Sequence, residues 1–243
     1  MVSLTKNKNS KIIANQVIDL EIKALKSLKK SLNKNFDKAV NAIVNCQSKI
    51  ILCGVGKSGL IASKIASTMS SVGSPSFSLS ANDCLHGDLG SISKKDLLII
   101  ISNSGKSEEL LPIIKFANRN KIKLIGIMSK KKSSLYKGSD IQILLPEVKE
   151  AGLGIVPTSS TSVQLAIGDA LAVAALNKKK FSKYDFSKLH PGGNLGKQLK
   201  TVEDLMVTKN KVPFINENKN LVSAIKIITS KKLGVLIAQN KNG

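Results

Sequence analysis

Short runs of branched aliphatic residues, each followed by a helical pattern, recur through most of the chain. Two examples are Lys49–Cys53 (KIILC) and Asp96–Ile101 (DLLIII). A strand made of consecutive Ile, Leu and Val is buried on both faces, which is typical of a parallel sheet covered by helices on both sides. The alternation therefore predicts an α/β three-layer sandwich with a parallel five-stranded sheet and right-handed crossovers.

The apolar periodicity also predicts where these elements begin and end. Helices are expected at 10–32, 36–44, 58–71, 106–119, 132–138 and 159–176, and strands at 49–53, 75–79, 96–101, 123–128 and 141–145. A shorter βαβ-like pattern follows, with strands at 212–215 and 235–238 around a helix at 221–231. We therefore expect a main domain at 1–200 and a small piece at 201–243, which is near the lower size limit for folding unaided.

The composition limits the partners and cofactors. The net charge is +22, but Arg119 is the only arginine and the lysines are scattered, so a solvated basic surface is expected rather than a nucleic-acid site. The three cysteines and two histidines lack metal-ligand spacing, and no metal site is expected. The N-terminus has no apolar signal core and no run approaches membrane-spanning length, which predicts a cytoplasmic protein without a membrane partner.

Two glycine- and hydroxyl-rich loops follow predicted strands. Gly54–Gly59 follows the first strand, and Ser102–Ser107 follows the third. A strand that ends in such a loop before a helix offers N–H groups, hydroxyls and the helix dipole to an anion. Neither loop fits a Walker motif or GxGxxG. Because both lie at the carboxyl ends of parallel strands, we predict a phosphorylated ligand held between them.

Several polar side chains of these loops are candidate phosphate ligands. Hydroxyls and amides donate well to phosphate oxygens, although a serine at such a position is also a common helix N-cap. A third hydroxyl cluster opens the long helix, where it serves either as a capping region or as another wall of the pocket. The candidates are Ser58, Ser102, Asn103, Ser104, Ser107, Thr158 and Ser159.

A second group of residues suits proton transfer and charge stabilisation. His86 and His190 are the only histidines and both lie beside glycines, without an apolar setting that would explain them as core residues. Glu150 precedes a glycine-bearing stretch and is a candidate base. Lys57 can reach a ligand from the first loop, and Glu109 either joins the site or complements a helix dipole.

Seven short motifs, taken together and in order, resemble the sugar isomerase (SIS) domains, and specifically the arabinose-5-phosphate isomerases. They are Gly56-Lys57-Ser58-Gly59, His86-Gly87-Asp88-Leu89-Gly90, Ser102-Asn103-Ser104-Gly105, Lys149-Glu150-Ala151, Pro157-Thr158-Ser159-Ser160-Thr161, Gly168-Asp169-Ala170-Leu171-Ala172 and His190-Pro191-Gly192-Gly193. The resemblance covers roughly residues 10–200, and the piece from Val202 is similar to the first half of a CBS domain. Lys106 departs from the glutamate that is usual in the family.

The resemblance implies interconversion of D-ribulose 5-phosphate and D-arabinose 5-phosphate, the first step toward 3-deoxy-D-manno-octulosonate of lipopolysaccharide. By matching position, the polar active-site set is Lys57, Glu109, Glu150 and His190, with His86 nearby. It also implies a phosphosugar substrate, no cofactor, and a dimer or tetramer in which one subunit completes another's pocket.

The residue types suit an enediolate mechanism. We expect Glu150 as the C–H base, a histidine moving hydroxyl protons, Lys57 stabilising the enediolate and Glu109 orienting Lys57 or a histidine. Two other interpretations stay open. One is a sugar-phosphate sensor, since SIS domains also occur in transcriptional regulators, and the other is an isomerase of a different phosphosugar.

Overall fold

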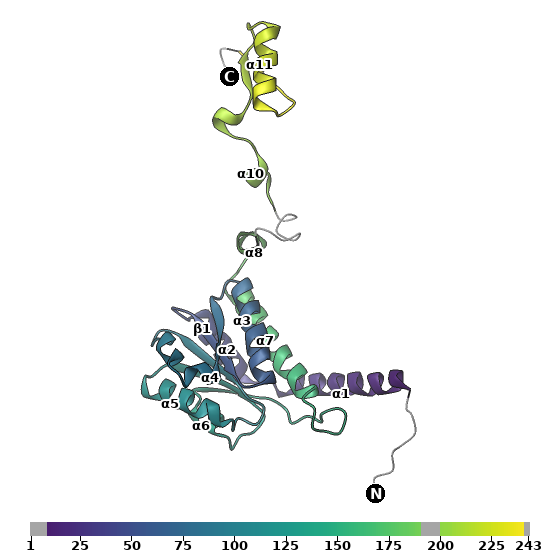
Figure 1. Cartoon of the computed structure of the whole chain (residues 1–243), viewed down its shortest axis with the longest axis vertical. Coiled ribbons are helices and arrows are strands. Elements are labelled where there is room, and N and C mark those ends of the chain that lie inside the picture. The colour runs from purple at the N-terminus through teal and green to yellow at the C-terminus, as the bar shows by residue number, and fades with distance from the viewer. Residues whose placement is uncertain (1–8, 191–199, 241–243) are drawn as a thin grey trace. The chain divides into compact units, whose positions relative to one another are not determined.

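The computed structural model describes residues 9–190 and 200–240, and the chain divides into two compact units (Figure 1). The main unit is Met1–His190 and the small unit is Pro191–Gly243. The boundary predicted at residue 200 falls inside the second of these units. Each unit is described by itself.

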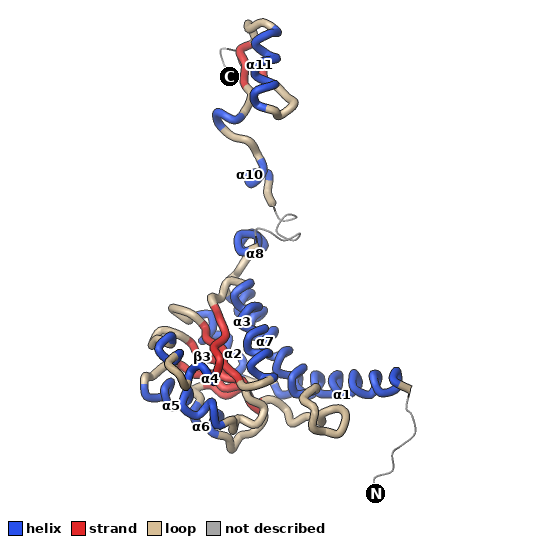
Figure 2. Tube along the Cα trace, in the orientation of Figure 1, coloured by secondary structure: helices blue, strands red, loops and turns tan. Residues whose placement is uncertain are grey.

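The main unit contains the predicted five-stranded parallel sheet, drawn in red in Figure 2. Its strands are β1 (Ile50–Gly54), β2 (Ser76–Ser80), β3 (Leu97–Ile101), β4 (Lys123–Met128) and β5 (Ile141–Leu144). They lie in the order β2-β1-β3-β4-β5, and all neighbours are parallel. The strand order reverses direction between β1 and β3, and ligands bind at that point in open α/β sheets.

Helices cover both faces of the sheet. The helices of the main unit are α1 (Ser10–Ser31), α2 (Lys34–Val44), α3 (Lys57–Ser71), α4 (Ala81–Cys84), α5 (Leu111–Arg119), α6 (Ser134–Gly138), α7 (Ser159–Lys178) and α8 (Lys183–Leu189), with 3-10 turns η1 (Asp88–Ser91) and η2 (Glu108–Leu110). Buried side chains of α1, α2, α3 and α7 form one core with the sheet, and those of α4, α5 and α6 form a second. The three-layer architecture is confirmed.

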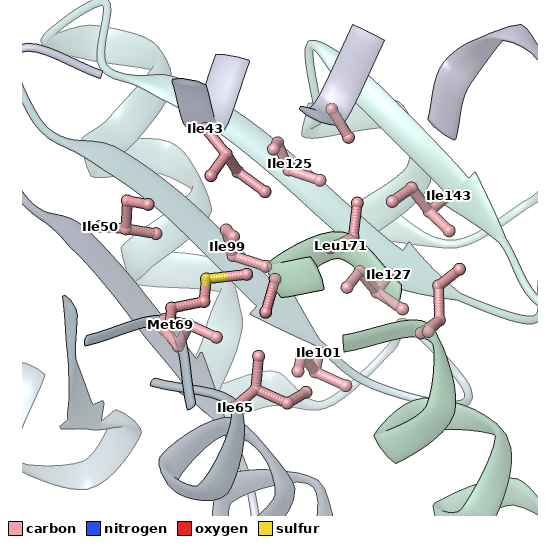
Figure 3. Packing of buried hydrophobic residues seen from close by; sticks show 14 of the residues in the cluster. Ile43, Ile50, Ile65, Met69, Ile99, Ile101, Ile125, Ile127, Ile143 and Leu171 are labelled. Atoms are coloured by element: carbon pink, nitrogen blue, oxygen red, sulfur yellow. The ribbon is translucent and has the colours of Figure 1, made fainter. Parts of the chain in front are cut away.

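Alternate residues of each strand enter these two cores. Ile50 and Ile99 belong to the cluster under α2, α3 and α7, whereas Ile51 and Ile100 belong to the other cluster. Figure 3 shows Ile99 together with Met69 of α3 and neighbouring strand side chains. Strands with continuous aliphatic sequence are required here because neither face of the sheet meets water.

The α7 helix is the core helix of the main unit. Within the part of the chain that the structure describes, it is the one helix long and apolar enough by composition to cross a membrane, so the expectation that no segment has that length is wrong. Its buried residues, such as Leu171 and Ala175, nevertheless pack in the core. A Cβ on Gly168 would lie 2.1 Å from Cδ1 of Ile65, so glycine permits the close approach of α7 to α3.

The helix predicted at 106–119 begins later than expected. The 3-10 turn η2 comes first, and α5 starts at Leu111, with Pro112 in its first turn. Proline favours the first turn of a helix because it has no N–H to contribute to the helical hydrogen bonds. The dipole of α5 therefore starts several residues beyond Ser107, and the donors that the Ser102–Ser107 loop offers are mainly its own N–H and O–H groups.

The other predicted elements agree with the structure to within two residues, while the short helical segments α4, η1, α8, α10 and η3 were not predicted. The small unit contains α10 (Val202–Leu205), η3 (Lys209–Lys211), β6 (Phe214–Asn216), α11 (Leu221–Lys231) and β7 (Ile237–Gln239). The strands β6 and β7 pair in parallel, as a βαβ connection requires. Its likeness to half of a CBS domain remains a prediction.

Candidate active site

The loop between β1 and α3 brings the backbone of a helix N-terminus to the carboxyl edge of the sheet. Gly56 has φ +58°, which only glycine adopts readily, and a Cβ on Gly59 would lie 2.8 Å from the Gly54 carbonyl oxygen. Lys57 is the first residue of α3 and its side chain is exposed, while Ser58 is half-buried. The loop therefore presents an ammonium group and free amides at the point where the strand order reverses.

The loop after β3, Ser102–Ser107, forms a compact set of hydroxyls that we call the phosphate loop. Ser102 is buried, its Oγ lies 3.2 Å from Ser107 Oγ, and it accepts a hydrogen bond of 3.1 Å from the Gly105 amide. Ser104 Oγ accepts from the Lys106 amide at 3.3 Å. The Ser102–Ser107 contact uses one hydroxyl hydrogen, so the other remains available to a ligand, as does that of Ser104.

Asn103 has a different role in this loop. It is exposed, and its backbone carbonyl accepts from the Ser129 amide at 3.0 Å and from the Ser129 hydroxyl at 2.7 Å. Ser129 follows β4 and was not among the predicted site residues. It fixes the backbone of the phosphate loop to the neighbouring strand, and only a long-range contact could have revealed this role.

The hydroxyl cluster Thr158–Ser160, which we call the capped segment, is arranged differently. The Glu150 Oε2 accepts hydrogen bonds from the amides of Thr158 at 2.8 Å and Ser160 at 3.3 Å, and from the Thr158 hydroxyl at 3.2 Å. Thr158 Oγ1 also accepts from the Ala151 amide at 3.0 Å. The carboxylate thus satisfies amides at the start of α7, a position where negative charge is favourable.

Glu150 is consequently a stabilised anion. Burial by itself would raise the pKa of its carboxyl, but hydrogen bonds from Ser160 and Thr158 outweigh that effect and hold the pKa below its ordinary value. A carboxylate in this state is a weak base. Ser160 belongs to this arrangement but was not singled out from the sequence, because a serine within a capping region carries no distinctive signal.

The neighbouring Ser159 is fully buried, and its hydroxyl has no hydrogen-bond partner in the described part of the chain. Thr158 and Ser159 were predicted phosphate ligands. The structure shows that the Thr158 donors are engaged with Glu150 and that Ser159 is shielded from solvent.

Two further candidate groups lie on separate elements. Glu109 is half-buried in η2, directly beyond the phosphate loop, and His86 is exposed between α4 and η1, beyond the end of β2. Within the described ranges, no hydrogen bond or ion pair joins any two of Lys57, Glu109, Glu150, His86 and His190. The first four nevertheless follow strand ends at the carboxyl edge of the sheet.

His190 is separated from that edge. The α7 helix runs back along the sheet, and Lys179 at its end donates to the Gly73 carbonyl and the Ser74 hydroxyl, just before β2 begins. The short helix α8 and His190 follow from there, with the imidazole stacked on Phe186 and its Nδ1 2.9 Å from the Phe186 carbonyl oxygen. A single chain therefore leaves His190 beyond the amino edge. The residues that follow it in the motif, 191–193, lie outside the described range.

Cys53 and Cys84 contribute no nucleophile to this site. Burial raises the pKa of Cys53 to about 12 and that of Cys84 to about 11. Both thiols stay protonated near neutral pH and act as small core residues.

A cavity of about 450 Å³ opens beside the β1–α3 loop. It is bounded by that loop, by the end of β2 with Ser80, and by residues that follow β2, including Asn82 and Asp88. Pockets of this size accommodate small-molecule ligands. The cavity is lined by Gly54, Gly56 and Gly59 of the β1–α3 loop region, whereas Lys57 is not among its lining residues.

Comparison with known proteins identifies the family of the chain. The SIS domain model matches residues 43–174. Arabinose 5-phosphate isomerase KdsD of Yersinia pestis is 40% identical over 224 residues, covering 91% of this chain and 68% of that protein. KdsD of Francisella tularensis is 40% identical over 245 residues, covering 98% and 74%. Among solved structures, the c3406 protein of Escherichia coli CFT073 in complex with arabinose 5-phosphate has a TM-score of 0.72 and 36% identity, covering 76% of this chain and all of that one.

The parallel α/β sheet, the matching domain model and these relatives together define a phosphosugar isomerase. The chain belongs to the SIS domain family and, within it, to the arabinose 5-phosphate isomerases.

Proposed function

We propose that the protein interconverts D-ribulose 5-phosphate and D-arabinose 5-phosphate in the cytoplasm, as the first step toward 3-deoxy-D-manno-octulosonate. The observation that carries the proposal is the hydroxyl cluster of the phosphate loop after β3, with Lys57 following the neighbouring strand β1, in a chain whose relatives are named for this reaction. The arabinose 5-phosphate bound to the Escherichia coli neighbour supports the same substrate.

The reaction needs a proton removed from C1 of the ketose, an enediolate, and a proton delivered to C2. One hydroxyl proton also moves from O1 to O2, so no atom is gained or lost. The phosphate loop holds the substrate through its phosphate and thereby orients the carbons. The Lys57 ammonium stabilises the negative charge that develops on the enediolate oxygens.

The structure supports a different division of roles between the two carboxylates than the sequence did. Glu150 is hydrogen-bonded to the start of α7, which lowers its basicity and gives it a positioning role. Glu109 accepts no hydrogen bond from the described residues and lies next to the phosphate loop, so its lone pairs are available. We assign proton removal at carbon to Glu109 and hydroxyl proton transfer to a histidine.

The test is to incubate the purified chain with ribulose 5-phosphate in deuterated water and follow the products by NMR. We expect arabinose 5-phosphate carrying deuterium at C2. Lys57→Met should abolish the signal, whereas Lys38→Met, a matched change of an exposed lysine on α2, should not. Absence of both aldose and deuterium exchange would reject the reaction.

The same assay distinguishes the roles of Glu109 and Glu150. Glu109→Gln should stop solvent exchange, while Glu150→Gln should retain it at a reduced rate. The reverse pattern would return the base role to Glu150.

We also propose that the active protein is a homo-oligomer in which His190 completes the site of a second copy. The location of His190 beyond the opposite edge of the sheet supports this arrangement. So do two exposed apolar surfaces. One is on the first half of α1, with Ile12 50% and Ile18 54% exposed, and the other is the turn after Glu150, with Leu153 89% exposed.

Subunit complementation tests the shared site. Lys57→Met and His190→Ala chains should each be inactive, and their co-expression with two different tags should give mixed oligomers. Mixed pairs purified through both tags should have about half of the wild-type activity, because one of the two sites in each pair is intact. Purified mixed oligomers without activity would show that His190 acts within its own chain or not at all.

A further inference from the structure

A second cavity lies on the other side of the phosphate loop from Lys57. It spans the carboxyl ends of three adjacent strands, β3, β4 and β5, and has a volume of about 610 Å³. Its lining residues come from three loops: Ser104 and Lys106, Ser129 to Lys132, and Leu144 to Glu147. Of the predicted site residues it contains Ser104 alone, so it is distinct from the space beside β1.

The rim of this cavity is strongly cationic. Lys106 reaches it from the phosphate loop, and Lys130, Lys131 and Lys132 reach it from the loop after β4. Lys130 is paired with Glu147 at 2.7 Å. The other three lysines form no ion pair with any residue in 9–190 or 200–240, so three ammonium groups surround the opening without a counter-charge.

The floor of the cavity is apolar. Leu144, Leu145 and Pro146 line it where β5 ends, and Ser104 and Ser129 also belong to its lining. A concave surface of one charge sign concentrates oppositely charged ligands, and an apolar floor accepts a ligand part that carries no charge.

We propose that this cavity binds a small molecule carrying two or more linked phosphate groups. Three unpaired ammonium groups from two loops suit a chain of phosphates better than a single one, and the cavity has room for an attached organic group. The ligand would contact Ser104 and Lys106, so it would adjoin the loop that holds the substrate phosphate. The proposal is independent of the proposed reaction, because binding is measured without turnover.

The experiment is calorimetric titration of the full chain with pyrophosphate at low ionic strength. Lys131→Gln/Lys132→Gln should weaken binding about tenfold, since it removes two of the three unpaired charges. Glu147→Gln should tighten it about threefold, because Lys130 is released from its partner. The matched control is Lys29→Gln/Lys30→Gln on exposed positions of α1, which removes the same charge and should change the affinity less than about twofold.

Orthophosphate and adenosine diphosphate distinguish the chemistry of the ligand. Orthophosphate should bind about tenfold more weakly than pyrophosphate, and the nucleotide should bind at least as well. Equal loss of affinity in the α1 control would show that pyrophosphate responds only to net charge, and this would overturn the proposal.

Enzyme kinetics provide the second criterion. Lys131→Gln/Lys132→Gln should leave KM and kcat for the phosphosugar unchanged in the absence of pyrophosphate. If KM rose by the same factor as the affinity for pyrophosphate fell, the cavity would belong to the substrate phosphate, and this would also overturn the proposal. No saturable binding of pyrophosphate to the wild-type chain would do the same.

Discussion

The phosphate loop and the capped segment have similar composition, but they differ in whether their hydrogen-bond donors are already engaged within the chain. Both are serine-rich stretches at the carboxyl edge of the sheet, and each precedes a helical segment. In the phosphate loop, the Ser102 and Ser107 hydroxyls contact each other and keep a donor for a ligand. In the capped segment, the Thr158 and Ser160 donors are already engaged by the Glu150 carboxylate.

The difference shows that a hydroxyl cluster near a helix N-terminus is an anion site only if the chain does not supply the anion itself. Here the anion is the Glu150 carboxylate, which the turn after Glu150 brings to the start of α7. Ala151 pairs with Val156 in an antiparallel bridge, and Gly152 and Gly154 adopt positive φ, which returns the chain to place Glu150 at the start of α7. The phosphate loop has no comparable acidic neighbour bound to it among the described residues.

The largest effect is expected from Ser102→Ala in the phosphate loop. Loss of a hydrogen bond to a charged phosphate should raise KM for the phosphosugar about 10- to 100-fold, equivalent to about 1.5–3 kcal/mol. The fold should survive, because the Gly105 amide keeps its bond to the Ser102 carbonyl at 3.1 Å. Steady-state kinetics and a thermal melt measure the two quantities, and an unchanged KM would reduce Ser102 to a structural residue.

Glu150→Gln should act on stability in the capped segment. The neutral amide accepts hydrogen bonds more weakly and gives no charge to the α7 N-terminus, so the free energy of unfolding should fall by about 1–3 kcal/mol. Urea unfolding measures the change. Full stability combined with complete loss of turnover would mean that Glu150 acts on the substrate rather than on α7.

A smaller effect is expected from Thr158→Val, which removes a hydroxyl but keeps the branched shape. Its bond to Glu150 and the acceptor of the Ala151 amide are lost, which should cost about 1–2 kcal/mol of stability. KM should change by less than about twofold. If KM rose as far as in Ser102→Ala, Thr158 would be a phosphate ligand after all, and the contrast between the two segments would disappear.

The smallest expected effect is the pH dependence of the stability that Glu150 contributes. The pKa of Glu150 in the folded chain lies below the ordinary value of 4.5, so its charge stabilises the fold above that pH, and this stabilisation is lost as the pH falls through the folded pKa. The stability difference between wild type and Glu150→Gln should therefore be constant near neutral pH and shrink in acid.

Asp96 is a second carboxylate whose pKa is lowered by folding, so it also affects stability in acid. Burial tends to raise its pKa, but hydrogen bonds from Ser48, Ser93 and Lys49 lower it to about 2. Wild type and Glu150→Gln share this carboxylate, so its contribution cancels in the difference. A difference that stays constant through the acid range would show that Glu150 has an ordinary pKa.

Local pattern was sufficient for the architecture. Runs such as Asp96–Ile101 are rich in branched aliphatic residues, which favour buried strands, and a parallel sheet of such strands needs helices on both faces, so the layers and the positions of both glycine- and hydroxyl-rich loops followed from the sequence. The late start of α5, at Leu111 instead of Lys106, was missed because a helical pattern does not distinguish a 3-10 turn from the first turn of an α-helix.

The state of each site residue depended on contacts between distant segments. Only the tertiary structure shows that Glu150 turns back onto Thr158, that Ser129 holds Asn103, and that α7 carries the chain to the amino edge before His190. The sequence by itself determined the fold and indicated candidate loops for an anion. The tertiary structure decided which donors remain free to bind it, because a hydrogen-bond donor is available only when no neighbouring part of the folded chain has already engaged it.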